Sequence, residues 1–498
     1  MLDAEPFAPA GGPLGTSRRS ARNASVRAAG EVIGKGASAA FFIVMARQLG
    51  PDDFGAFVFA LSLSTVFILA SGFGTEELVS REVARDPERV HSYLANVVAI
   101  KGLSSVVLLL AVFVTVNLTG QSPDARLATY IVAVGVAVEN LGRTWNSVFT
   151  AYERLAMISI SLVVQRTLTA AVGIALLLSG SGLITVSIVF SAGAVLGLLV
   201  TTQVLHRFVV VVRWRLDRSM WLPLVRAGVP IGLVTLVFTV LMRVDVVLLG
   251  VLTGGEDNNE VGFYGAAFRL VEATLFISWA FSSSVLPWLA RRDDRAAIAR
   301  GYELGAKVIT AVLMPIGLGF VLLAPELVAL LYGSGYDDAV LPLRLLGVMT
   351  LLYGISSLTA TVLISRDRPL EFGRVLALVA VENVVLNVIL IPRYGADAAA
   401  FNAALSALIL AVSSLVLIAR RFGTVNPLRA FAAPVVGGAA MSAVIVVLSL
   451  PLVPAVVVGG LAYLAGTIVF ERIAFPADFK QIRDALPLPT GRRPGRAA

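Results

Sequence analysis

The sequence predicts an all-α polytopic membrane protein with fourteen transmembrane helices, arranged as two pseudo-symmetric six-helix lobes followed by two C-terminal helices. Three observations predict this fold. Hydrophobic residues make up 57% of the chain and charged residues 14%, and the mean hydropathy is +0.86, which exceeds what a soluble domain of this length buries. Long apolar stretches recur along the chain. One short motif occurs twice.

The composition also excludes several kinds of chemistry. The chain has no cysteine and only two histidines, His91 and His206, so a disulfide framework, a thiolate zinc site and a histidine-rich metal site are excluded. We therefore predict no metal and no cofactor. The net charge of +8 does not indicate a nucleic-acid partner, because membrane proteins carry basic residues at their cytoplasmic face.

Fourteen apolar stretches follow residues 1–24, which are rich in Pro, Gly and Arg and are predicted to form a disordered cytoplasmic tail. Each stretch is long enough to cross roughly 30 Å of hydrocarbon, and each must be helical because lipid cannot satisfy backbone N–H and C=O groups. The predicted spans are 26–47, 56–78, 96–117, 127–149, 156–180, 184–205, 227–252, 263–288, 303–331, 340–364, 373–391, 396–419, 430–450 and 453–471.

The distribution of basic residues predicts the orientation. With fourteen spans and the N-terminus in the cytoplasm, the arginine-rich loops all fall on the cytoplasmic side, as the positive-inside rule requires. Both termini are therefore predicted to be cytoplasmic. The opposite side retains few basic residues, namely Arg47, Arg126, Arg344 and Arg393. The basic residues that fall within spans are Lys35, Lys101, Arg143, Arg166, Arg243 and Arg269.

A repeated motif predicts the two lobes. DFGAFVFAL at 53–61 aligns with EVGFYGAAF at 260–268, and six predicted spans separate the copies, so both enter the membrane from the same side. The predicted domains are an N-lobe (25–206), a cytoplasmic linker (207–226), a C-lobe (227–419), helices 13 and 14 (420–472) and a cytoplasmic tail (473–498). The linker interleaves arginines with Trp214 and apolar residues, which suits an interfacial segment or a simple basic topology anchor.

Charged residues inside spans need a partner, a polar cavity or access to the surface. Lys101 lies near the start of a span and is expected to snorkel to the cytoplasmic surface. Glu31 and Lys35 are four residues apart, which suits a self-neutralised pair on one helix face. In the same helix Gly30 and Gly34 predict close packing against a neighbouring helix.

The second half of the chain carries charges of a different kind. Arg243 has no acidic residue three or four positions away, so its partner must come from another helix or from a ligand. Arg269 either pairs with Glu272 on its own helix or lines a cavity. Glu382, Asn383 and Asn387 are predicted to form an interhelical hydrogen-bond cluster in preference to a substrate contact.

Seven short strings occur along the chain in this order: LGPDDFG at 49–55, REVAR at 81–85, RVD at 243–245, GFY at 262–264, LAPE at 323–326, LYG at 331–333 and IPRYGA at 391–396. In these strings the chain resembles the bacterial oligosaccharide flippases of the multidrug/oligosaccharidyl-lipid/polysaccharide exporter superfamily. That resemblance implies a two-lobe, V-shaped transporter in the bacterial inner membrane, and not an enzyme. It would move undecaprenyl-pyrophosphate-linked oligosaccharide from the cytoplasmic to the periplasmic leaflet by alternating access.

The resemblance also implies a site. Helices 1, 2, 7 and 8 would line a cationic cavity, because a pyrophosphate that leaves water needs compensating charge and forked donors. The residues implied for headgroup binding are Lys35, Arg243 and Arg269, with Arg166 in helix 5 as a further candidate; those implied for charge tuning or ion exchange are Asp245 and Glu272, with Glu31 beside Lys35. The implied partners are the lipid-linked oligosaccharide, membrane lipids, Na⁺ or H⁺ as coupling ion, and other polysaccharide-assembly proteins.

Three alternatives remain open at this point. A peptidoglycan-precursor (lipid II) flippase shares the fourteen-helix plan. A multidrug exporter typically has twelve helices and an acidic cation site, so helices 13 and 14 argue against it. A polysaccharide polymerase or ligase usually needs a sizeable periplasmic loop, whereas the hydrophilic outer loops predicted here are short.

Overall fold

The computed structural model describes residues 13–253, 257–290, 294–366, 368–423 and 425–485. Every regular element within those residues is helical, which confirms the all-α prediction. Among the described residues, twelve helical segments are long and apolar enough to cross a membrane. The principal helices are α1 (Pro13–Ala70), α2 (Thr75–Arg85), α3 (Val90–Leu118), α4 (Pro123–Ala151), α5 (Leu155–Leu178), α6 (Leu183–Phe208), α7 (Trp221–Leu252), α8 (Asn259–Ala290), α9 (Arg295–Leu322), α10 (Ala324–Leu331), α11 (Val340–Ile364), α12 (Pro369–Phe422), α13 (Pro427–Leu448), α14 (Leu452–Ala474) and α15 (Pro476–Ala485).

Helices α1 and α12 each contain a break. In α1 the chain leaves helical geometry at Gly50 (φ 77°, ψ 175°), directly before Pro51. In α12 it does so at Gly395 (φ 51°, ψ −131°). Positive φ at both positions favours glycine. The predicted spans 26–47 and 56–78 lie on either side of Gly50, and 373–391 and 396–419 lie on either side of Gly395. The count of fourteen spans stays a prediction.

The predicted tails need correction. Helix α1 begins at Pro13, so residues 13–24, expected to be disordered, are helical, and they are rich in the good helix formers Ala and Arg. At the other end, the predicted cytoplasmic tail 473–498 begins with the amphipathic helix α15. The disorder predicted for residues 1–12 lies outside the described residues, as does the part of the C-terminal tail beyond residue 485.

The chain divides into two compact units. Unit 1 comprises Met1–Ala273, Val328–Pro342 and Leu376–Asn402, and unit 2 comprises Thr274–Leu327, Leu343–Val375 and Ala403–Ala498. These units are not the predicted lobes, because unit 1 takes in the first half of α8 and part of α12. The lobe boundaries therefore stay a prediction.

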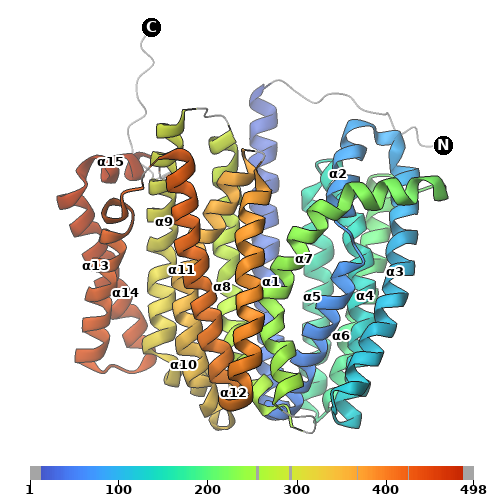
Figure 1. Cartoon of the computed structure of the whole chain (residues 1–498), viewed down its shortest axis with the longest axis horizontal. Coiled ribbons are helices and arrows are strands. Elements are labelled where there is room, and N and C mark those ends of the chain that lie inside the picture. Colours follow the sequence, from blue (N-terminus) through green and yellow to red (C-terminus); the bar gives the residue numbers. More distant parts are fainter. Residues whose placement is uncertain (1–12, 254–256, 291–293, 367, 424, 486–498) are drawn as a thin grey trace. The chain divides into compact units, whose positions relative to one another are not determined.

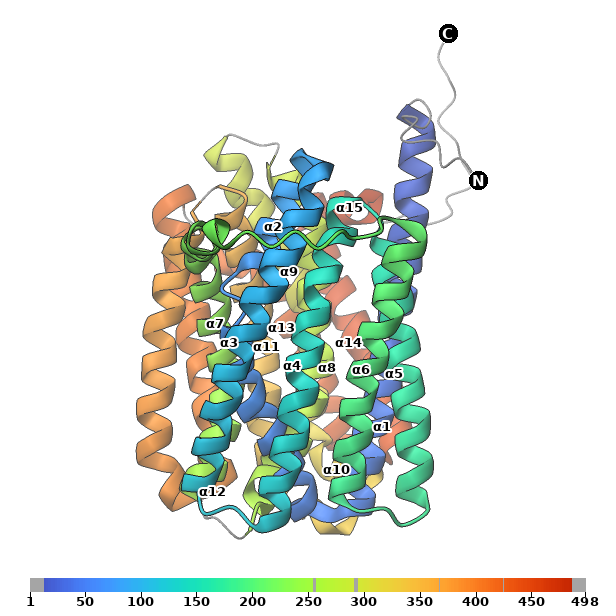
Figure 2. The ribbon, with the colours of Figure 1, turned by 90° about the vertical axis from the view of Figure 1, so that its right-hand side faces the viewer.

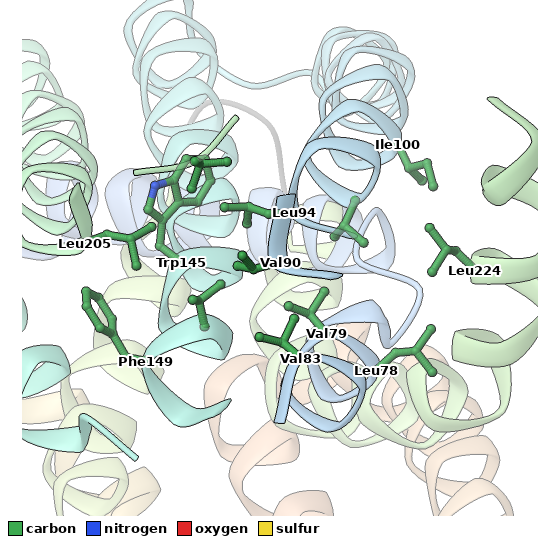
Figure 3. Close-up of a cluster of buried hydrophobic side chains, with 13 residues drawn as sticks. Leu78, Val79, Val83, Val90, Leu94, Ile100, Trp145, Phe149, Leu205 and Leu224 are labelled. Carbon is green, nitrogen blue, oxygen red and sulfur yellow. The ribbon is translucent and has the colours of Figure 1, made fainter. Parts of the chain in front are cut away.

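In unit 1, helices α3 to α6 run side by side (Figure 2), and α1 packs against α5. The contact between α1 and α5 uses small residues. A Cβ at Gly30 would lie 2.9 Å from Ser159 Cβ, and one at Gly34 would lie 3.3 Å from Arg166 Cδ. This confirms the predicted packing role of the two glycines. A buried cluster around Leu94, which includes side chains from α2, α3, α4 and α6, fills one end of the unit (Figure 3).

In unit 2, α13 packs against both α9 and α14, and α15 follows α14 directly (Figure 1). The core between these helices includes Leu323, Met441 and Tyr463. The Tyr463 hydroxyl donates to the Ala311 carbonyl at 2.8 Å, which ties α14 to α9. Helices α13 and α14, which fall outside the predicted duplication, are thus fixed to α9.

Candidate functional site

Two arginines in unit 1 share one carboxylate. Arg243 of α7 donates to Glu272 Oε1 at 2.5 Å, and Arg269 of α8 donates to Glu272 Oε2 at 2.8 Å. The arginine side chains are 17% and 15% exposed and that of Glu272 is 33% exposed. The partner of Arg243 therefore comes from another helix, and Arg269 makes the local ion pair that its spacing from Glu272 allows. With two cations and one anion, the cluster keeps a net positive charge.

The cluster lies against α1. The guanidinium carbon of Arg269 stands 3.9 Å from the centroid of the Phe42 ring, close enough for a cation–π contact. Arg269 Nη2 is buried and has no hydrogen-bond partner among the described residues. A buried guanidinium donor without an acceptor is unusual and matches a site that an anionic ligand completes. No pattern in the sequence predicts this unsatisfied donor.

The other cations predicted for this site lie on or beside α1. Lys35 is seven residues before Phe42, so it lies on the same face of α1, about 10 Å toward the N-terminus. Its side chain is partly exposed. Arg166 of α5 packs against Gly34, the neighbour of Lys35. The Glu31 side chain lies outside the described residues. The structure thus brings Arg243, Arg269 and Glu272 together, while the part of Lys35 and Arg166 in the same site stays a prediction.

Asp245 forms a separate polar centre on α7. Its residue is 3% exposed, and its carboxylate accepts hydrogen bonds from Tyr264 Oη at 2.8 Å and Asn387 Nδ2 at 2.6 Å. Asn387 also donates to Asn383 Oδ1 at 3.1 Å. Asn383 and Asn387 thus take part in the predicted interhelical hydrogen-bond cluster, whereas the part of Glu382 in it stays a prediction. The central position of Asp245 in this cluster was not predicted from the sequence. The available signal was the presence of three short polar residues, Asp245, Asn383 and Asn387, inside apolar spans.

The two copies of the repeated motif touch each other. A Cβ at Gly55 would lie 2.1 Å from the Asn258 carbonyl oxygen and 2.8 Å from the Gly262 amide nitrogen. Asp52 Oδ1 accepts a hydrogen bond from the Asn258 amide at 2.7 Å. Gly55 and Gly262 are equivalent positions of the motif, and only glycine permits this backbone approach. The contact falls on the side predicted to face outward.

A tyrosine beside this contact was not predicted from the sequence. Tyr336 is 1% exposed, and its hydroxyl donates to the Ala46 carbonyl at 3.0 Å. Its ring stands between those of Phe54 and Phe263, at centroid distances of 6.3 and 6.2 Å.

The expectation for Lys101 was wrong. Its residue is 0% exposed, and Nζ donates to Glu76 Oε1 at 2.6 Å, to the Asn140 carbonyl at 2.9 Å and to Thr144 Oγ1 at 3.3 Å. A buried ammonium with a charged partner and two further acceptors has no reason to reach the surface. Glu76 belongs to α2, the short helix that follows the end of α1, and no sequence pattern indicates that this helix folds back onto α3.

Within the described residues, twelve helices are long and apolar enough to cross a membrane, which defines a multi-pass membrane protein. Residues 20–292 match the family described as polysaccharide biosynthesis protein, and the chain belongs to that family. It is therefore a membrane transporter of polysaccharide biosynthesis, and not an enzyme.

Relatives and solved structures agree with this assignment. The chain is 21% identical over 374 residues to the probable low-salt glycan biosynthesis flippase Agl15 of Haloferax volcanii, across 72% of this chain and 75% of Agl15. It is 27% identical over 207 residues to the probable flippase AglR of the same organism, across 40% of this chain and 43% of AglR.

Two solved structures share the fold. The lipid II flippase MurJ, in an inward closed conformation, has a TM-score of 0.77 at 14% identity, covering 90% of this chain and 99% of MurJ. An inward-facing multidrug resistance MATE family transporter of the MOP superfamily has a TM-score of 0.62 at 15% identity, covering 78% of this chain and 94% of that structure.

Proposed function

We propose that this chain is a flippase that moves undecaprenyl-pyrophosphate-linked oligosaccharide from the cytoplasmic to the outer leaflet of a bacterial inner membrane. The observation that carries the proposal is the pair Arg243 and Arg269. The two arginines share Glu272, and Arg269 Nη2 is a buried donor that has no acceptor among the described residues. The family, and the glycan-biosynthesis flippases among its relatives, support a glycan cargo.

The chemistry of the arginine pair suits a pyrophosphate. Each guanidinium presents a fork of N–H donors, and phosphate oxygens can accept two of them in parallel. Glu272 holds both forks in place while no cargo is bound, and this lowers the cost of burying two cations. A pyrophosphate that enters the site accepts hydrogen bonds from some of these donors, including Arg269 Nη2. Lys35, two turns earlier on α1, and Arg166 would supply further charge along the same path.

We propose alternating access as the transport mechanism. The contacts of Gly55 with Asn258 and of Tyr336 with Ala46 keep the predicted outer side of unit 1 closed. In this state the cargo would enter from the cytoplasmic side, where both termini are predicted to lie. These contacts would break for release.

Asp245 is the proposed coupling group. It is a buried carboxylate held by neutral donors from Tyr264 and Asn387, so a Na⁺ ion or a proton would neutralise it. Replacement of Asp245 by Asn should remove the dependence of transport on the Na⁺ or H⁺ gradient. Transport that keeps its gradient dependence would remove Asp245 from this role.

The proposal is tested by flipping in proteoliposomes. The probe is an undecaprenyl-pyrophosphate-linked oligosaccharide with a fluorescent sugar, and the readout is the fraction that a membrane-impermeant quencher reaches over time. Arg243→Ala is expected to reduce the rate at least about tenfold, since a charge-assisted hydrogen bond contributes roughly 1.5–3 kcal/mol. Arg243→Lys should flip the probe faster than Arg243→Ala if charge alone matters. It should be nearly as slow as Arg243→Ala if the forked donor geometry of the guanidinium matters.

The matched control is Arg420→Ala, which removes an exposed arginine of α12 and should leave the rate unchanged. Equal size-exclusion profiles and thermal midpoints show that the variants fold. An unchanged rate for a folded Arg243→Ala would overturn the site. The fold shared with MurJ favours one second candidate cargo, lipid II, which carries the same pyrophosphate. Faster flipping of a lipid II probe than of the oligosaccharide probe would assign that cargo.

A further inference from the structure

The segment between α6 and α7 is held rigidly along the first two turns of α3. The Asn96 side chain, 0% exposed, donates to the Arg215 carbonyl at 3.2 Å and accepts from the Asp217 amide and from Trp221 Nε1, both at 2.9 Å. His91 Nδ1 accepts from the Arg213 amide at 3.2 Å. Figure 2 shows the segment crossing the ends of α3 and α4 on its way to α7.

One side of this segment is anchored in the core. Val212 is 8% exposed and belongs to the buried cluster that also contains Leu94 and Leu205. The anchor and the hydrogen bonds to Asn96 and His91 fix the backbone from residue 212 to 221. The remaining side chains of the segment are therefore displayed in a defined arrangement, and they are not free to fold back.

The other side displays bulky apolar groups beside unpaired cations. Val211, Trp214 and Leu216 are 66%, 57% and 65% exposed. The side chains of the flanking arginines, Arg213, Arg215 and Arg218, are exposed and have no ion-pair partner in the part of the chain that the structure describes. The one acidic residue of the stretch is Asp217. Its carboxylate already accepts hydrogen bonds from the amide and the hydroxyl of Ser219, at 2.9 and 2.6 Å.

We propose that residues 211–218, termed here the linker face, form a docking surface for anionic phospholipid headgroups of the surrounding membrane. Arginines bind the phosphodiester groups, while Trp214 and its apolar neighbours enter the headgroup–acyl boundary, where amphipathic aromatic rings are favoured. Charge complementarity selects the occupant, because three unpaired cations face a leaflet whose anionic lipids attract basic residues. The proposal concerns the membrane around the protein and does not depend on which cargo is moved.

The test uses the full chain in mixed micelles titrated with phosphatidylglycerol or phosphatidylcholine, each brominated in its acyl chains to quench tryptophan. The signal of Trp214 is the difference between the wild type and Trp214→Phe. Half-maximal quenching is expected at an about tenfold lower mole fraction of phosphatidylglycerol than of phosphatidylcholine, and added salt should reduce this preference.

The decisive variant is Arg213→Gln/Arg215→Gln/Arg218→Gln, which should raise the required fraction of phosphatidylglycerol roughly tenfold. All three side chains are exposed, so the fold is retained, as the thermal midpoint will show. The matched control removes Arg81, Arg85 and Arg89, which already pair with Glu82 and should change the fraction less than about twofold.

Three outcomes would overturn the proposal. Equal quenching by the two lipids would show that the linker face recognises no anionic headgroup. A control variant that weakens the response as much as the decisive variant would show a diffuse charge effect with no specific surface. A response of the wild type to an acidic peptide but not to phosphatidylglycerol would assign the linker face to a protein partner, which also contradicts a lipid surface.

Discussion

Replacing Glu76 by Gln is expected to destabilise the fold much more than replacing its partner Lys101 by Met. Lys101 is fully buried, and Glu76 is its only charged partner among the described residues. Removing one partner of a buried ion pair costs about 3–5 kcal/mol, because an uncompensated charge stays behind. The Glu76 side chain is 27% exposed, so water relieves part of this cost, and we expect about 3 kcal/mol for Glu76→Gln.

The reverse replacement leaves a different residue behind. Lys101→Met removes the buried charge, conserves much of the volume and leaves Glu76 with access to water, so its cost should stay below about 1.5 kcal/mol. In the double variant no charge remains at the site. The two single effects should therefore not add, and the coupling should be at least about 1.5 kcal/mol.

The assay is the thermal midpoint of the purified protein in one detergent for the wild type, both single variants and the double variant. The expected order of stability is wild type, then Lys101→Met and the double variant close together, and Glu76→Gln last. Equal losses for both single variants, or additive losses in the double variant, would refute the idea that a buried ammonium sets the cost. Either result would mean that water reaches Lys101.

Two further predictions concern other contacts. Hydrogen bonds from Arg429 and Lys307 lower the pKa of Asp478 from 3.8 to about 2. This carboxylate therefore stabilises unit 2 above about pH 4, and its contribution is lost as the pH falls toward 2. In Asp478→Asn the thermal midpoint should change less with pH across that range than in the wild type. A pH profile that stays parallel to the wild type would contradict this. Gly262→Ala, whose Cβ would lie 2.0 Å from the Pro51 carbonyl, should open the outer contact and expose a cysteine placed at the buried Phe54 to a thiol reagent; the chain has no other cysteine. Gly335, with open space around its Cβ position, is the control. Unchanged labelling would argue against closure by these glycines.

The sequence was sufficient for the fold class because hydrophobic length is a local property. Composition and span length predict membrane helices without any tertiary information, and the twelve candidate spans agree with that class. The hydropathy window divides α1 and α12 into two spans each, whereas each is one continuous helix with a break at Gly50 or Gly395. The number of apolar stretches and the number of helices therefore differ. The match of 53–61 with 260–268 also pointed to residues that prove to be in contact.

The candidate site was only partly predictable, because a charge inside a span signals that a partner exists without saying which one. The i,i+3 spacing of Arg269 and Glu272 identifies a local pair, whereas the second bond from Arg243 depends on how α7 and α8 pack. Lys101 shows the opposite failure. Its position near the end of a span predicted a side chain at the membrane surface. The short helix α2 instead brings Glu76 into contact with Lys101, and no periodicity in the sequence indicates this contact.

The charged cluster of unit 2 bears on how the chain can be shortened. Asp478 of α15, whose side chain is 2% exposed, holds Lys307 of α9 and Arg429 of α13. Glu471 of α14 shares the Lys307 ammonium at 2.6 Å. Cutting the chain before Pro476 would leave Lys307 with Glu471 alone and would remove the ion pair between Arg429 and Asp478. A fusion partner or affinity tag should therefore follow α15 and never replace it.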